Sequence, residues 1–346
     1  MFMKDINTIV YYGPGKLVGE KRPMPLARKG EICIRVEAVS ICGSDIGAYK
    51  NASDRFEPPL ILGHEFSGVI HQIGEDVTRL KVGQRVTVNP MIYCRNCFYC
   101  ERGLINSCNN RRGVGTTIML GRCNGAFAEY IVLPEFAAYE LPASISFVQG
   151  ALLEPLSVAF SAAQKGGFTP GETDVVIGVG PIGLLIVQAL RALGAGKIIA
   201  VDMVQKRLDT AIACGADMGV KFEERFEQIR EATNGIGADK IIISTGNAAL
   251  PDGINMVRNA GSIVLLGLSK QDISVDFVQV VSRGISIYGS FMFTREIHSQ
   301  AIQMMAEGKI DIAPIVTSIR PLSEAAQAFK DITTPGTEEI KIVLKP

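Results

Sequence analysis

The sequence predicts an α/β fold in which a doubly wound parallel sheet is joined to a second domain rich in strands. In the second half of the chain, continuous apolar runs such as 240–245 and 262–267 alternate with helical stretches. This alternation is typical of a parallel sheet that helices cover on both faces. In the first half, residues 31–39 alternate charged and apolar positions, as a half-buried strand does. The length of 346 residues suits two domains of about 150 residues each.

Strands dominate the first half, with one interruption. The strand pattern of 31–39 continues at 66–73 and 84–88 and returns at 127–133. Residues 89–125 differ, because they are rich in Cys, Arg, Asn and Gly and show little periodicity. They predict a lobe that has no apolar core of its own.

The second half opens with a strand, a glycine turn, a helix and a second strand. This pattern runs from Val175 to Asp202, and Gly194 ends the helix. The tail from about residue 294 mixes helix and strand patterns. The helical stretches expected between the apolar strands lie near 204–214, 223–232 and 247–258.

Charge and hydropathy exclude several classes of protein. Lys and Arg number 35 and Asp and Glu number 35, so nothing in the net charge favours a nucleic-acid or anionic-membrane partner. Residues 1–10 lack the apolar core of a secretory signal, and the longest uncharged apolar run, 175–190, is shorter than the about 20 residues of a membrane helix. We therefore expect a cytoplasmic protein whose eight Cys are metal ligands or free thiols.

Four cysteines of the lobe have the spacing of a metal site. Cys94, Cys97, Cys100 and Cys108 form the pattern C-x2-C-x2-C-x7-C. Four thiolates so close in sequence suit a closed tetrahedral zinc site, in which the metal replaces the missing core. An iron–sulfur cluster is the rival, but the ferredoxin run places Pro after its fourth Cys, whereas Asn109 follows here. The pattern favours a structural zinc.

A glycine-rich turn predicts a dinucleotide site. In G-V-G-P-I-G, Gly178 permits the tight turn, Gly180 lets the backbone approach a pyrophosphate, and Gly183 lets the helix pack on the strand. Asp202 ends the next strand, near the spacing of about 20 residues expected for an acid that binds the ribose. The alternative is a glycine turn followed by a solvent-exposed Asp.

The residues around Asp202 favour NAD over NADP. An acid at this strand end binds the ribose hydroxyls and repels a 2′-phosphate, and no Arg is adjacent to it. Arg207 is either a contact of the adenine or ribose or an ordinary surface residue. The predicted cofactor-binding residues are Gly178, Gly180, Pro181, Ile182, Gly183, Asp202, Arg207, Thr245 and Leu266.

Three further residues suggest a second metal site. Cys42 begins C-G-S-D after the first strand region, His64 stands in Gly-His-Glu, and Glu154 opens the second half. A thiolate, an imidazole and a carboxylate suit a redox-inert, borderline-soft cation with one position left for a substrate. From spacing alone, a buried Cys and a hydrogen-bonded His remain an open alternative.

Together the motifs resemble those of the zinc-containing medium-chain dehydrogenases. Residues 63–74 match the family's G-H-E-x-x-G-x5-G signature, and C-G-S-D, the cysteine lobe and G-V-G-P-I-G appear in the family's order. The resemblance covers essentially the whole chain. It implies an alcohol–carbonyl oxidoreductase with two zinc ions per chain, NAD as cofactor and a homodimeric or homotetrameric assembly. The implied domains are a GroES-like catalytic domain at 1–153 and 292–346, with its zinc lobe at about 89–125, and a Rossmann domain at 154–291.

The residue at position 154 indicates the branch of the family. Glu154 stands in L-L-E-P-L-S-V-A, where other alcohol dehydrogenases place a Cys, and this form is similar to polyol, threonine and sugar-acid dehydrogenases. The segments 106–130 and 289–294 most resemble the L-idonate 5-dehydrogenase type. The resemblance implies that Cys42, His64, Glu65 and Glu154 surround the catalytic zinc, and it leaves open which Glu binds it directly.

Two departures from the family leave the substrate undecided. Position 47 is Gly where many relatives have a proton-relaying His, and position 292 is Met where polyol relatives often have an Arg. A polyol or sugar acid is the first candidate. A less polar or cyclic secondary alcohol and L-threonine are the alternatives.

The resemblance also implies a mechanism. Zinc would activate the substrate hydroxyl, and the hydride would pass to NAD, which gives a ketone. Ser44 would accept the alcohol proton, although a hydroxyl in a turn can instead bond local backbone. A zinc-free quinone or enone reductase and a non-catalytic dinucleotide-binding protein are the rivals. The predicted metal ligands argue against both. The predicted catalytic residues are Cys42, Ser44, His64, Glu65 and Glu154.

Overall fold

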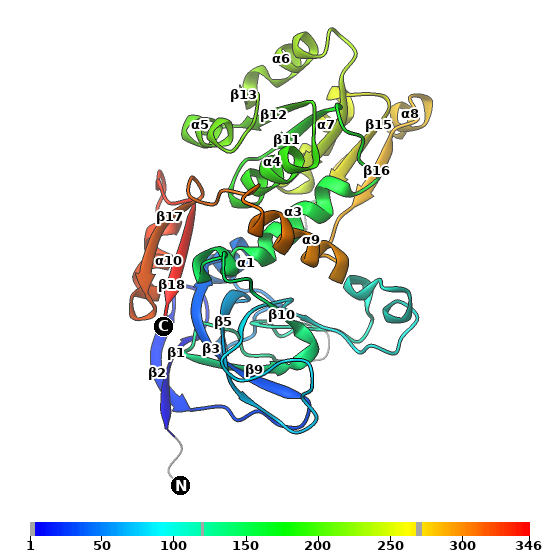
Figure 1. Cartoon of the computed structure of the whole chain (residues 1–346). Coiled ribbons are helices and arrows are strands. Elements are labelled where there is room, and N and C mark those ends of the chain that lie inside the picture. Colours follow the sequence, from blue (N-terminus) through cyan, green and yellow to red (C-terminus); the bar gives the residue numbers. More distant parts are fainter. Residues whose placement is uncertain (1–3, 119–120, 268–271) are drawn as a thin grey trace. The chain divides into compact units, whose positions relative to one another are not determined.

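A computed structural model describes residues 4–118, 121–267 and 272–346 (Figure 1). The predicted cysteine lobe, 89–125, includes residues 119–120, which lie outside this described part. Contacts between residues divide the chain into two compact units. These units are defined by contacts alone, and the bounds of the predicted domains stay a prediction. Unit 1 comprises Met1–Glu154, Thr294–His298 and Val316–Pro346, and unit 2 comprises Pro155–Phe293 and Ser299–Ile315.

Unit 1 is built on a seven-stranded sheet with the order β10-β6-β5-β3-β18-β17, in which β9 also pairs with β3. The β17–β18 pair is parallel and the other pairs of this sheet are antiparallel. A three-stranded sheet, β2-β1-β4, and a two-stranded sheet, β7-β8, complete the unit. The strands are β1 (Asp5–Tyr11), β2 (Leu17–Pro23), β3 (Glu31–Ser40), β4 (Leu60–Ile61), β5 (Glu65–Ile73), β6 (Arg85–Val88), β7 (Met91–Ile92), β8 (Arg112–Gly113), β9 (Tyr130–Pro134), β10 (Ala138–Glu140), β17 (Val316–Pro321) and β18 (Lys341–Lys345).

The C-terminal tail enters the centre of this sheet. Strand β18 lies antiparallel to β3, with Val343 opposite Ser40 and Leu344 opposite Val39. Its residues 341–344 are buried, so this apolar run is a central strand. The helices of unit 1 are α1 (Gly43–Lys50), α2 (Phe147–Ala151), α10 (Ala325–Thr333), η1 (Cys100–Arg102), η2 (Ile105–Ser107), η3 (Glu135–Ala137) and η6 (Leu322–Glu324).

Unit 2 contains a six-stranded parallel sheet with the order β13-β12-β11-β14-β15-β16. Nearly every residue of β11, β12 and β14 is buried, as expected for a sheet covered on both faces. The predicted α/β class is therefore confirmed. The strands are β11 (Thr173–Ile177), β12 (Lys197–Asp202), β13 (Met218–Lys221), β14 (Ala238–Ile243), β15 (Val257–Leu265) and β16 (Ser286–Gly289).

Helices connect the strands of this sheet. Helix α3 begins at the end of unit 1, and α9 contributes residues to both units. The described part of the chain holds no helix long and apolar enough to cross a membrane. The helices are α3 (Leu153–Gln164), α4 (Pro181–Leu193), α5 (Gln205–Ala213), η4 (Phe222–Glu224), α6 (Arg225–Ala232), η5 (Asn247–Ala249), α7 (Leu250–Met256), α8 (Phe277–Ser282) and α9 (Arg295–Ala306).

Several predicted elements have different ends in the structure, and two of them show why. The helix expected over 247–258 ends at Met256, because Val257 pairs with Ala238 and begins β15. The strand expected at 127–133 begins only at Tyr130. Residues before it bond elsewhere: the N–H of Phe127 donates to the carbonyl oxygen of Leu62 at 3.0 Å.

Candidate active site and metal centres

The four cysteines of the lobe converge on one point. Their sulfur atoms all lie within 4.8 Å of one another. Four of the Sγ–Sγ distances are 3.5, 3.6, 3.8 and 3.9 Å. A tetrahedral zinc with Zn–S bonds of about 2.3 Å requires edges of about 3.8 Å. The arrangement therefore fits a closed zinc site, whose residues are Cys94, Cys97, Cys100 and Cys108.

The lobe has only a small apolar core around these thiols. Tyr93, Ile105 and Cys108 are buried in it, and the ring of Phe136 packs on Tyr93 with a centroid distance of 4.9 Å. So small a cluster offers little hydrophobic stabilisation, which agrees with the expectation that a metal would organise this segment.

Local structure brings Cys42, His64 and Glu65 together. One possible ligand atom of each residue lies within 4.8 Å of the others. Cys42 is the N-cap of α1, where its sulfur accepts a hydrogen bond from the N–H of Ser44 at 3.5 Å. Its own N–H donates to Asp45 Oδ2 at 3.0 Å. Glu65 begins β5, and His64 precedes it, so the sheet and the helix cap fix the three residues.

Three buried polar atoms at this centre have no hydrogen-bond partner among the described residues: Asp45 Oδ1, His64 Nδ1 and Glu65 Oε1. Buried polar atoms are paired in most proteins, so this group of atoms fits a bound cation. A ligating His often directs its second nitrogen to a carboxylate, and Asp45 Oδ1 lies 3.7 Å from His64 Nδ1. Sequence reasoning missed Asp45, although it stands in the C-G-S-D motif.

Glu154 lies outside the group of three. It stands in the first turn of α3 and is 4% exposed. The pKa of its carboxyl is raised to about 7, mainly by burial; His64 opposes the rise and the nearby charge of Glu65 contributes to it. Glu154 is therefore near the centre, but the structure brings Glu65, and not Glu154, within 4.8 Å of Cys42 and His64.

A buried lysine offsets part of this acidic centre. Burial alone would raise the pKa of the Glu65 carboxyl, but Lys341 and His64 lower it below its usual value. Burial, followed by the charge of Glu65, raises the pKa of the Cys42 thiol. Sequence reasoning missed Lys341. A lysine inside the apolar tail I-K-I-V-L was the one sequence feature that pointed to a buried charge. The sequence does not show that this lysine pairs with residue 65.

The remaining predicted residues of the catalytic region lie as follows. Ser44 is half-buried in the first turn of α1. Gly47 is exposed, and a Cβ built there would meet no heavy atom within 4 Å. Met292 has a left-handed backbone with φ of 52°.

The glycine turn has the shape expected for a dinucleotide. Helix α4 begins at Pro181 with Gly180 as its N-cap. Gly178 has φ of 85°, and a Cβ there would clash with the side chain of Thr245. A Cβ on Gly183 would clash with the carbonyl oxygen of Gly178. At Gly180 a Cβ would meet nothing within 4 Å, so the space at the helix N-terminus is open for a phosphate.

Asp202 is buried, and each of its two carboxylate oxygens accepts a hydrogen bond from a backbone N–H. Its Oδ2 accepts from the N–H of Val179 and its Oδ1 from the N–H of Val204, each at 2.9 Å. Arg207 Nη1 lies 3.8 Å from Oδ2. The alternative of a solvent-exposed Asp is therefore wrong.

A pocket of about 460 Å³ adjoins this carboxylate. Four of the nine predicted cofactor residues line it: Gly178, Asp202, Arg207 and Thr245. The other five, Gly180, Pro181, Ile182, Gly183 and Leu266, do not. Leu266 follows β15 and donates its N–H to the carbonyl oxygen of Ile243 at 3.1 Å. The lining residues are Ile177, Gly178, Val201, Asp202, Met203, Val204, Arg207, Phe222, Thr245, Gly246, Ala248 and Ala249.

Comparisons with known proteins agree with this geometry. Residues 28–143 match the alcohol dehydrogenase GroES-like domain, and residues 181–307 match the zinc-binding dehydrogenase family. A probable D-xylulose reductase A of Aspergillus fumigatus is 35% identical over 324 residues, which cover 90% of this chain and 89% of the relative. The chain belongs to the zinc-containing medium-chain dehydrogenases.

Further relatives of this dehydrogenase extend the likeness to the whole chain. Sorbitol dehydrogenase of Bacillus subtilis is 32% identical over 350 residues, with 99% of this chain and 98% of the relative covered. A crystal structure described as a short chain alcohol dehydrogenase of Escherichia coli CFT073, complexed with cofactor NADH, superposes with a TM-score of 0.91 and 28% identity, covering 99% of both chains. The predicted fold is confirmed, and so is the predicted class of a zinc-containing alcohol dehydrogenase. For the cofactor, predicted to be NAD, the comparisons support an NAD(P)-dependent enzyme.

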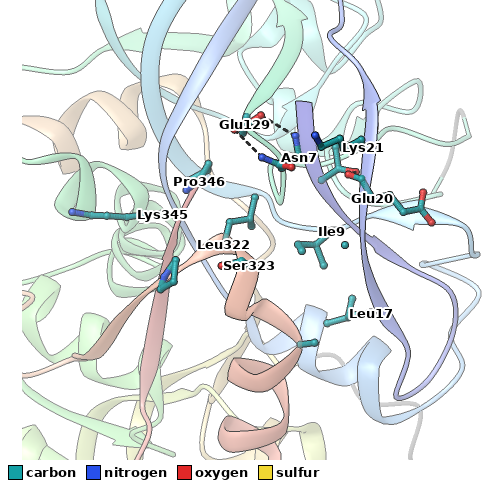
Figure 2. Close-up of a pocket in the computed structure, with 14 residues that line it drawn as sticks. Asn7, Ile9, Leu17, Glu20, Lys21, Glu129, Leu322, Ser323, Lys345 and Pro346 are labelled. Atoms are coloured by element: carbon teal, nitrogen blue, oxygen red, sulfur yellow. Dashed lines mark hydrogen bonds between the residues drawn. The ribbon is translucent and has the colours of Figure 1, made fainter. Parts of the chain in front are cut away.

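A second pocket of the dehydrogenase lies away from these residues. It has a volume of about 500 Å³ and lies beside β1, β2, η6 and the C-terminal residues (Figure 2). On its wall, Asn7 donates its N–H to Glu129 Oε2 at 2.8 Å. None of the predicted zinc ligands or cofactor residues lines it, so it is not the candidate active site.

Proposed function

We propose that this dehydrogenase oxidises a secondary alcohol of the polyol or sugar-acid type to a ketone with NAD. The observation that carries the proposal is the group of Cys42, His64 and Glu65, whose ligand atoms lie within 4.8 Å of one another beside buried oxygens that lack hydrogen-bond donors. The names of the relatives, D-xylulose reductase and sorbitol dehydrogenase, support the substrate class. A less polar or cyclic secondary alcohol and L-threonine are the alternative substrates.

The candidate ligands form two separate groups, one for a catalytic zinc and one for a structural zinc. When bound, zinc lowers the pKa of a substrate hydroxyl as a Lewis acid, and NAD accepts the hydride. Cys42 and His64 would supply the thiolate and the imidazole that hold the catalytic zinc, and Glu65 or Glu154 the carboxylate. A second, structural zinc would be held by Cys94, Cys97, Cys100 and Cys108.

Ser44 would carry the proton of the alcohol. Its backbone N–H bonds the sulfur of Cys42, which keeps the residue beside the metal ligand. Position 47 holds no basic side chain and is open to solvent, so Ser44 and water would form the exit path.

Asp202 would select NAD. The buried carboxylate lines the pocket beside the glycine turn, where it would accept hydrogen bonds from ribose hydroxyls and repel a 2′-phosphate. Gly178, Gly180, Pro181, Ile182 and Gly183 would hold the pyrophosphate, and Arg207, Thr245 and Leu266 would complete the cofactor site.

We also infer where the enzyme acts and how it assembles. None of the eight cysteines forms a disulfide, which supports a reducing, cytoplasmic location. A homodimer or homotetramer is supported by β16, a strand at the edge of its sheet, and by α8, where three apolar side chains are 66–80% exposed. The exposed side chains are Phe277, Val278 and Val281.

A substrate screen tests the proposed function. Purified protein would be assayed for NADH absorbance with polyols, aldonates, L-threonine and cyclic secondary alcohols, before and after chelation of the labile zinc. The proposal expects zinc-dependent NAD reduction with a polyol or an aldonate. Zinc-independent turnover, or activity with L-threonine alone, would contradict it.

A further inference from the structure

A buried lysine lies beside the proposed catalytic centre. Lys341 is 2% exposed. Its Nζ lies 2.5 Å from Glu65 Oε2 and donates to the carbonyl oxygen of Ile41 at 3.0 Å. A buried ammonium group is costly unless it is paired, so Lys341 and Glu65 depend on each other.

The two oxygens of Glu65 have different surroundings. Oε2 is held by two donors, the hydroxyl of Ser40 and the ammonium of Lys341. Oε1 is buried, and no described residue gives it a hydrogen bond. One oxygen is thus fixed by the protein, while the other is left for a cation beside Cys42 and His64.

Both donors belong to the central sheet. Ser40 ends β3 and Lys341 begins β18, and these strands pair in antiparallel fashion. Their backbones are therefore held by hydrogen bonds between strands rather than by a flexible loop. Such a scaffold can hold one carboxylate oxygen in a single position.

We propose that Lys341 is a positioning residue of the catalytic zinc centre: together with Ser40, it keeps Glu65 Oε2 away from the metal. Glu65 can then offer only one oxygen, and a coordination position remains open for the substrate. This inference rests on the proposed function, because it concerns the zinc that Cys42 and His64 would hold. A Glu65 carboxylate released from Lys341 would be free to bind through both oxygens. With water or substrate also bound, the metal would then have five ligands, which catalytic zinc sites can accommodate, and the substrate would share the metal with one more donor.

Lys341→Met tests this role, because Met keeps much of the side-chain volume and removes the charge. The labile zinc would be replaced by Co²⁺, whose visible spectrum reports coordination number. We expect four-coordinate bands in the wild type and weaker, shifted bands in the variant. Release of the catalytic zinc to a chelator should be no faster than in the wild type. The kcat/KM for the alcohol should fall by about 10- to 100-fold, the usual effect of changing a residue that orients a metal ligand.

Three further variants separate positioning from folding. Ser40→Ala removes the other donor without changing the charge and should shift the cobalt spectrum in the same direction, by less. Lys341→Arg restores a cationic donor and should return the spectrum toward that of the wild type. Lys240→Met is the matched control, because Lys240 is also 2% exposed and donates to the carbonyl oxygen of Ala163 at 3.0 Å in unit 2. It should lower the thermal stability and leave the cobalt spectrum unchanged.

The outcomes distinguish this inference from the proposed function. A wild-type cobalt spectrum in both Lys341→Met and Ser40→Ala would overturn the role of Lys341 and leave the proposed function intact. Faster zinc release together with lower thermal stability would indicate a purely structural lysine and would overturn it too. If the wild-type protein showed no thiolate-to-Co²⁺ charge-transfer band after the exchange, Cys42 would not bind the metal. That result would contradict the proposed metal centre itself.

Discussion

The carboxylate of Asp202 and the backbone N–H of Val179 are joined by a hydrogen bond of 2.9 Å. This bond ties the end of β12 to the glycine turn that precedes α4. Each carboxylate oxygen has two lone pairs and accepts one bond from the backbone, so both keep capacity for the ribose hydroxyls. Asp202 therefore shapes the turn and can select the cofactor at the same time.

Replacing Asp202 by Ser should change the choice of cofactor. The substitution removes acceptors for the ribose hydroxyls and the repulsion of a 2′-phosphate, and it leaves Arg207 without its acidic neighbour. The ratio of kcat/KM for NAD over NADP should fall by roughly tenfold or more, which corresponds to about 1.4 kcal/mol. Asp202→Asn, which removes only the charge, is the control for the turn. An unchanged ratio in both variants would place the specificity elsewhere.

The two proposed zinc ions should differ in lability. The four-cysteine site is closed, whereas the other keeps an exchangeable position. Cys42→Ser should abolish activity and leave a folded protein with about one zinc per chain. Cys100→Ser should lower Tm by roughly 5 °C or more, because a closed site contributes folding energy. Metal analysis and thermal melts would check both variants, and equal loss of both metals in each would refute this division.

Ser44→Ala should impair proton transfer. We expect kcat for alcohol oxidation to fall by roughly 10²- to 10⁴-fold near neutral pH, the range for a positioned proton-transfer group. The loss should shrink at high pH, where the substrate hydroxyl ionises without a relay. Steady-state rates from about pH 6 to 10 would measure this dependence. If the loss is the same at every pH, Ser44 has no part in the relay.

Asp174 should make the stability of unit 2 depend on pH. Burial raises the pKa of its carboxyl to about 7, although Lys240 on the neighbouring strand opposes the rise. The unfolded carboxyl titrates near pH 3.9, so between about pH 4 and 7 the folded state binds more protons and loses stability as pH rises. Asp174→Asn should flatten this slope and melt at a higher temperature than the wild type at pH 8.

An exposed carboxylate provides the control for that measurement. Asp76 is on the surface and pairs with Lys29, where such pairs contribute little to stability. Asp76→Asn should therefore leave the pH profile of Tm unchanged. A slope that survives in Asp174→Asn would mean that another group causes it.

Sequence reasoning succeeded where the signal was local. The four cysteines of the lobe and the glycine turn each lie within one short segment. Their metal-binding and nucleotide-binding chemistry can therefore be predicted without knowing the fold. The alternation of apolar strands and helices likewise predicted the parallel sheet, because buried parallel strands must be apolar along their whole length.

Long-range pairings could not be predicted in this way. The contact of Lys341 with Glu65 depends on β18 lying beside β3, and nothing in either segment specifies that partner. The sequence also could not decide between Glu65 and Glu154, since the choice depends on where α3 begins relative to β5. Asp45 was within a recognised motif, but only the structure shows its approach to His64.

Anomalous diffraction at the zinc absorption edge tests the central claim most directly. Crystals of the protein with its metals retained should show two peaks per chain. One should lie among the four cysteines of the lobe, about 2.3 Å from each sulfur. The other should lie between Cys42 and His64, with a carboxylate oxygen of Glu65 or Glu154 as its next ligand. A peak in the lobe alone, or a second peak remote from Cys42 and His64, would contradict the account.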